Sequence, residues 1–132
     1  KPSSAIELGD GTIITAESGD LLGPSAALIL NTVKHLAGID HSIKLIPQEM
    51  IEPIQFTKLN YLQGHNPRLH TDEVLVALSV LSSRDENCRR ALEVLPQLNG
   101  CQVHSTVMLG EVDQKIFKKL GVGLTCDPVR KR

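Results

Sequence analysis

The 132-residue sequence contains very few aromatic residues: two Phe, one Tyr and no Trp. The core must therefore be built from Leu, Ile, Val and Ala, which make up most of the 41% of hydrophobic residues. Proteins that bind single-stranded nucleic acid stack the bases on aromatic side chains. The scarcity of such side chains argues against that class of function.

The chain also lacks an excess of charge of either sign. It has 14 Lys and Arg against 15 Asp and Glu, for a formal net charge of -1. A nucleic-acid-binding domain usually carries a basic field, and this composition provides none. The one basic cluster lies in residues 129–132, where we expect a solvated basic tail. We therefore expect no nucleic-acid partner.

No apolar run approaches the roughly 20 residues that a membrane span needs, so we expect no membrane partner. The three cysteines, Cys88, Cys101 and Cys126, form no CxxC pair, which excludes a zinc ribbon or a redox motif. Their number and spacing, and a start without a signal peptide, predict a reduced cytoplasmic protein. Because the chain starts at Lys1 without Met, we expect residues 1–128 to be one domain of a longer protein.

The strongest local pattern is an apolar stripe in residues 21–39, which predicts one helix. Pro24 suits the first helical position, and Gly38 suits the position just after the end. Before this helix, residues 5–8 and 12–15 flank Gly9-Asp10-Gly11, which predicts a β-hairpin.

The remaining elements follow from similar signals. Pro53 lies inside the next predicted helix or marks its first turn. Residues 74–81 also allow a buried strand, but the cap and acids at residues 71–73 favour a helix. In the helix that follows, the apolar spacing indicates that Cys88 is a core residue. We expect strands at residues 43–46, 101–108 and 122–126, and helices at 48–62, 71–81, 86–95 and 112–120.

This order predicts an α/β fold: a three-layer α/β/α sandwich with a mixed, mostly parallel sheet opened by a β-hairpin. It also matches a cytidine-deaminase-like topology without zinc ligands. Zinc deaminases carry H-x-E and P-C-x-x-C at two helix starts. The corresponding residues 23–25 and 47–50 contain neither His nor Cys, so we expect no metal and no cofactor.

Two helix N-termini still offer backbone N–H groups and positive partial charge to an anion. The candidate ligand-binding residues are Ser18, Gly23, Ser25 and Gln48. The alternative is that Ser25 is only a small residue packed near a cap. His35 shares a face with Asn31, which is typical of a solvated or interface surface. No pair of residues is spaced as a catalytic nucleophile and base, so we assign no catalytic residue.

Residues 21–39, then Asn99-Gly100-Cys101, and the ending at residues 120–128 resemble one family. It is the bacterial family called domain of unknown function 1846, and the resemblance is to its C-terminal domain. The resemblance implies a bacterial cytoplasmic protein of the sandwich type, but it supplies no established activity.

The preferred interpretation is therefore a non-catalytic structural or assembly domain of a larger protein. Its expected partners are the N-terminal domains of the same protein, and a homo-oligomer is a further option. The alternative function is a small anionic ligand or nucleotide site at the helix N-termini near Gly23 and Pro47. An N-terminal part of the protein would complete that site.

Overall fold

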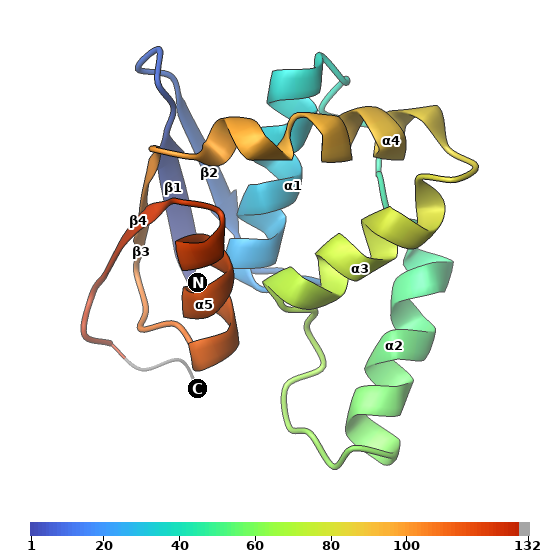
Figure 1. Ribbon diagram of the computed structural model, residues 1–132. Helices are drawn as coiled ribbons and strands as arrows, with labels where there is room; N and C mark the ends of the chain where they lie inside the picture. Colours follow the sequence, from blue (N-terminus) through green and yellow to red (C-terminus); the bar gives the residue numbers. More distant parts are fainter. Residues whose placement is uncertain (130–132) are drawn as a thin grey trace.

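A computed structural model describes residues 1–129 as a four-stranded sheet packed against helices (Figure 1). The strands are β1 (Ser3–Glu7), β2 (Ile13–Glu17), β3 (Gln102–Ser105) and β4 (Gly123–Cys126). The helices are α1 (Pro24–Ala37), α2 (Gln48–Asn60), α3 (Thr71–Leu81), α4 (Glu86–Glu93) and α5 (Glu111–Lys119), with a 3₁₀ turn η1 (Leu95–Leu98). The α/β class is confirmed. Most of the predicted basic tail, residues 130–132, lies outside the described residues.

The sheet has the strand order β2-β1-β3-β4 and is mixed. β1 is antiparallel to both β2 and β3, and β3 is parallel to β4. The predicted hairpin is therefore confirmed, but the prediction of a mostly parallel sheet is wrong. β1 lies between β2 and β3 and is antiparallel to both. Only β3 and β4, which are connected through α5, therefore form a parallel pair.

The helices lie on one side of the sheet (Figure 1). The burial of the strands agrees: Ile6 and Val103 are buried, whereas Glu7, Thr15 and His104 on the alternate positions are exposed. Successive side chains of a strand point to opposite faces. Residues 1–129 thus form two layers, and a third layer on the opposite face is not found among them.

Helix α1 packs on β1 and β2 with the predicted stripe. Ala26, Ile29 and Val33 are all at most 1% exposed. Gly38 ends the helix in the left-handed conformation, with φ of 68°, and its N–H bonds to His35 O. On the opposite flank, Asn31 Nδ2 donates to Thr15 O at 3.1 Å. This carbonyl faces away from β1, so α1 also covers part of the outer edge of β2.

The strand predicted at residues 43–46 is wrong, because this segment is a loop. Leu45 and Ile46 are both buried although they are neighbours, which a strand beside one core does not allow. The loop is fixed by a residue of the preceding helix α1, because Lys34 Nζ donates to His41 O and Ile43 O at 2.9 and 3.0 Å. A run of four apolar residues cannot reveal such a contact.

The other predicted helices are present with shifted ends. α2 is helical from Gln48 and contains Pro53. α3 is capped by His70 rather than by the predicted Thr71. η1, with Pro96 in its first turn, continues the path after α4. No helix in residues 1–129 has the length and apolar character to cross a bilayer.

Candidate functional site

Three of the four predicted ligand-binding residues lie near the start of α1. Gly23 is its N-cap and Ser25 lies in its first turn, 1% exposed. Ser18 lies in the preceding loop and is 8% exposed. The Gly23 N–H is already engaged, because it donates to Leu69 O at 3.1 Å. Among residues 1–129, the Ser25 hydroxyl is the buried side-chain polar group without a hydrogen-bond partner.

Gln48 is not brought to the same place. It starts α2, where its side-chain amide donates to Glu52 Oε2 at 3.0 Å on the same helix. The α2 residue that reaches the loop before α1 is Gln55, seven positions further on, which donates to Asp20 O at 2.9 Å. The predicted meeting of the α1 and α2 starts is therefore replaced by a contact with the later turns of α2.

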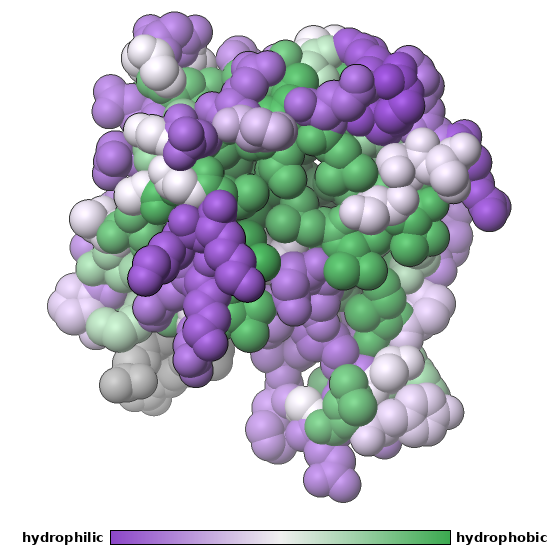
Figure 2. Space-filling view, viewed as in Figure 1, coloured by the Kyte–Doolittle hydropathy of each residue, from purple (hydrophilic) through white to green (hydrophobic). Residues whose placement is uncertain are grey.

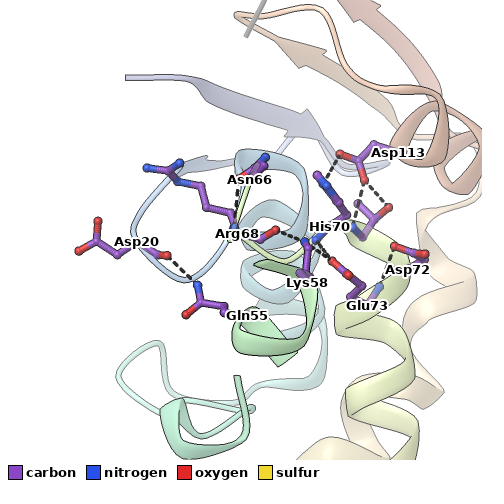
Figure 3. A network of polar contacts seen from close by, with 10 residues as sticks. Asp20, Gln55, Lys58, Asn66, Arg68, His70, Asp72, Glu73 and Asp113 are labelled. Carbon is purple, nitrogen blue, oxygen red and sulfur yellow. Dashed lines mark hydrogen bonds and ion pairs between the residues drawn. The ribbon is translucent and has the colours of Figure 1, made fainter. Parts of the chain in front are cut away.

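The helix starts that do come together are those of α1, α3 and α5. Leu22 and Leu69 form an isolated β-bridge just before α1 and α3. At the start of α3, both the N–H and the hydroxyl of Thr71 donate to Asp113 Oδ1, at 3.0 and 2.7 Å (Figure 3). Asp113 belongs to the first turn of α5. One carboxylate thus joins two helix starts.

A second carboxylate reinforces this junction. Glu73 Oε1 accepts from His70 N at 2.7 Å and from Lys58 Nζ at 2.9 Å (Figure 3). Lys58 Nζ also donates to Arg68 O at 2.6 Å. Asp113 and Glu73 already satisfy backbone N–H groups at the start of α3. Their negative charges would also repel a further anion at this helix start. The geometry is that of a structural joint between α2, α3 and α5.

A different polar cluster lies on the exposed face of the sheet. His104 of β3 is paired in register with Thr125 of β4. The Nδ1 of His104 lies 2.7 Å from Thr125 Oγ1, and its Nε2 lies 3.2 Å from Asp127 Oδ1. His104 and Asp127 are 49% and 52% exposed. His104 and Thr125 line a hollow of about 250 Å³ together with Ile13 and Gln102.

The order of hydroxyl, imidazole and carboxylate resembles that of a catalytic triad. All three groups, however, face solvent. Their spacing follows from the sheet, because residues in register on parallel strands lie side by side. Alternation correctly predicted that His104 points away from the core, but nothing in the sequence linked it to residues more than 20 positions later.

The thiol of Cys88 is not placed as a nucleophile. Cys88 is fully buried, as predicted, and its Sγ lies 3.3 Å from Leu45 O. Burial, together with the nearby charge of Asp85, raises the pKa of the Cys88 thiol to about 11. A thiol with such a pKa is a poor nucleophile. Within residues 1–129, no group of three or more His, Cys, Asp and Glu side chains is placed to hold a metal ion.

The comparison with known proteins decides the family. The family model described as "Domain of unknown function DUF1846, C-terminal" matches residues 1–132. The chain belongs to this family. It is 58% identical over 128 residues to a UPF0371 protein of Corynebacterium aurimucosum, and the match covers 97% of the chain. A UPF0371 protein of Streptococcus pyogenes is 44% identical over 129 residues, or 98% of the chain.

Members of the family are considerably longer than this domain. The chain spans 26% of the length of the relatives from both bacteria. The family model is that of a C-terminal domain, so the matched region in these relatives is accompanied by further chain. The predicted family resemblance is thereby confirmed, and the domain is the C-terminal part of a larger protein.

Proposed function

We propose that this domain is a non-catalytic structural domain that docks onto the remainder of a larger bacterial protein through the exposed face of its sheet. The observation that carries the proposal is the one-sided burial of the sheet. Ile13 on this face is 56% exposed, and the face carries the two neighbouring hollows of about 250 and 360 Å³. The solvent-facing side of such a sheet normally carries polar residues. The exposed apolar side chain of Ile13 therefore favours a contact surface at this place.

The position of the first residues supports the same surface. Ser3 N donates to Thr106 Oγ1 at 2.9 Å, and Thr106 N donates to Ser3 O at 2.9 Å. Ser3 and Thr106 both line the larger hollow on the exposed sheet face. In the longer relatives, the chain that precedes this domain therefore arrives beside that face. Packing of this chain on the sheet would supply the third layer of the predicted sandwich.

The test uses the longer protein that contains this domain. Ile13→Arg places a charge on the exposed sheet face, and Val76→Arg is the matched control because Val76 is 63% exposed on helix α3. We expect Ile13→Arg to increase hydrogen exchange along β1 to β4 and proteolytic release of the domain, while Val76→Arg leaves both unchanged. Equal behaviour of the two variants would contradict the proposal.

The deaminase-like topology stays part of the proposal, supported by the leading hairpin and the mixed sheet. Cytoplasmic location is likewise proposed, supported by the three free thiols.

Assembly into a homo-oligomer would be detected by sedimentation of the longer protein. A monomer would restrict the docking surface to contacts within one chain.

The second candidate function is an anion site at the start of α1. The observation that favours it is the buried Ser25 hydroxyl, which has no partner among the described residues. Inorganic phosphate would then raise the Tm of the longer protein, and Ser25→Ala would abolish the shift. An equal shift in the Ser25→Ala protein would eliminate this candidate.

A further inference from the structure

A separate apolar hollow lies between α1, α2 and the loop that replaces the predicted strand. Its volume is about 190 Å³. Its walls include Ala27 and Leu30 of α1, Leu45 of the loop and Ile51 of α2. Leu30, Leu45 and Ile51 are each at most 7% exposed, so these walls belong to the packed interior. The hollow is lined mainly by aliphatic side chains, which suits a hydrocarbon group.

Two amines accompany these apolar walls. Lys34 and Lys44 both line the hollow, and its lining contains no Asp or Glu. Lys34 also lines an adjoining hollow of about 200 Å³, together with His35 and His41. The lining of this second hollow contains no Asp or Glu either. Asn31 lines both hollows. The local charge is therefore positive, although the whole chain has a net charge of -1.

Lys34 is the informative member, because it is 9% exposed. Its Nζ donates to His41 O and Ile43 O, and an ammonium group has three N–H donors. One donor is thus left over. Within residues 1–129, Lys34 forms no ion pair with a carboxylate. Buried charges in proteins are usually paired, so this amine has room for an anionic partner.

The surroundings of Lys34 also favour an anionic partner for its amine. Burial lowers the pKa of its amine, and the nearby charge of Asp40 opposes this effect only in part. Asp40 is engaged elsewhere, since its Oδ1 accepts from Ser42 N at 2.8 Å and from Ser42 Oγ at 2.6 Å. A bound carboxylate would oppose the effect of burial and favour the charged form of Lys34.

We propose that this hollow binds a small amphipathic carboxylate, such as a short-chain aliphatic acid. The hydrocarbon chain lies among Leu30, Leu45 and Ile51, and the carboxylate accepts from Lys34 with Lys44 at the rim. The volume of about 190 Å³ is below the roughly 300–1,000 Å³ of pockets for drug-sized ligands, which restricts the ligand to a short chain. This site is independent of the docking function proposed above.

The experiment titrates the longer protein with hexanoate by calorimetry. Hexan-1-ol, which has the chain without the charge, and acetate, which has the charge with little chain, are the comparison ligands. We expect hexanoate to bind at least tenfold more tightly than either. Equal binding of hexanoate and hexan-1-ol, or no binding of hexanoate at millimolar concentration, would overturn the proposal.

Two variants locate the ligand. Lys34→Met is expected to reduce hexanoate binding at least tenfold, to the level of hexan-1-ol. Because Lys34 also holds the loop, Ala27→Leu provides a second variant that keeps the charge and fills the hollow, and it should remove binding of both ligands. Lys115→Met changes a lysine whose side chain is 65% exposed on α5 and should change neither. Binding that survives Ala27→Leu would refute this location.

A last comparison addresses a polypeptide occupant. If hexanoate binds the 132-residue chain but not the longer protein, another segment of the protein fills the hollow, and the small-ligand proposal is wrong. Tight binding by both proteins supports it. The readout does not involve the sheet face, so Ile13→Arg should leave hexanoate binding unchanged whether or not the docking proposal holds.

Discussion

Asp113 Oδ1 accepts two hydrogen bonds from Thr71, one from the backbone N–H and one from the hydroxyl, across 42 positions of sequence. Thr71 is fully buried. Removing the acceptor would therefore leave two buried donors without partners, which is costly. This contact fixes the start of α3 to the start of α5.

We predict that Asp113→Ala lowers the free energy of unfolding by roughly 2 to 3 kcal/mol, measured by urea denaturation. Asp113→Asn should cost less, because an amide oxygen can still accept. Asp127→Ala is the control: Asp127 is 52% exposed beside His104, so its loss should cost less than about 1 kcal/mol. Similar losses for Asp113→Ala and Asp127→Ala would show that the α3–α5 contact is dispensable.

Gly121 follows α5 with φ of 78°, a conformation that L residues rarely adopt. A Cβ at this position would lie 1.9 Å from Asn99 Oδ1. We expect Gly121→Ala to destabilise the domain by about 1 to 3 kcal/mol in the same denaturation assay. Gly19 has no positive φ and has open space around it, so Gly19→Ala should change stability by less than about 0.5 kcal/mol.

Pro53 lies inside α2 and cannot donate the hydrogen bond expected of an interior helical residue. We predict that Pro53→Ala slows hydrogen exchange of the α2 amides, because the substitution restores that donor and relieves the ring clash. Pro96 occupies the first turn of η1, where a missing N–H is tolerated. Pro96→Ala should accordingly give no comparable protection, and faster exchange in Pro53→Ala would contradict the prediction.

The thiol of Cys88 provides a pH-dependent prediction. With a pKa of about 11, only about one molecule in a thousand carries the thiolate at pH 8, so labelling should be far slower than at the partly exposed Cys126. The ordinary pKa is 9.0, so the unfolded state loses this proton first as the pH rises. The stabilising contribution is complete below pH 9 and is lost as the pH rises toward 11.

The measurement is the difference in unfolding free energy between the protein and Cys88→Ala as a function of pH. Other groups that titrate in both proteins cancel in this difference. We expect the difference to be constant below pH 9 and to shrink between pH 9 and pH 11. A difference that stays flat over this interval would mean that Cys88 is not the protonated buried thiol described above.

The sequence predicted the elements whose signals are local. The apolar stripe of α1 spans several turns, and Gly38 marks its end, so this helix needs no information from the rest of the chain. The hairpin around Gly9-Asp10-Gly11 was predictable for the same reason. The segment at residues 43–46 was not, because its path depends on Lys34, whose amine binds its carbonyls.

The contacts of the candidate site were largely beyond the reach of the sequence. Ser25 and Gly23 were placed correctly at a helix start, but Gln48 was assigned to the same place only through the expected sheet topology. The partners of Thr71 and His104 lie 42 and 21 to 23 positions away. Such pairs become neighbours only after the strand order and the packing of α3 against α5 are known.

The surface provides one further observation. On the face shown in Figure 2, apolar side chains gather over the helix layer. Exposed Val76 and Val80 of α3 and exposed Phe56 and Leu59 of α2 belong to that layer. Nothing among residues 1–129 shows what covers these side chains, so they carry no assignment.

The contact between Asn31 and Thr15 has a consequence for aggregation. An uncovered edge strand is a template onto which another chain can add a strand. At β2, the amide of Asn31 occupies one of the carbonyls that an incoming strand would use. Helix α1 thus hinders the addition of a further strand at this edge of the sheet. Asn31 thereby leaves one acceptor fewer along the outer edge of the sheet.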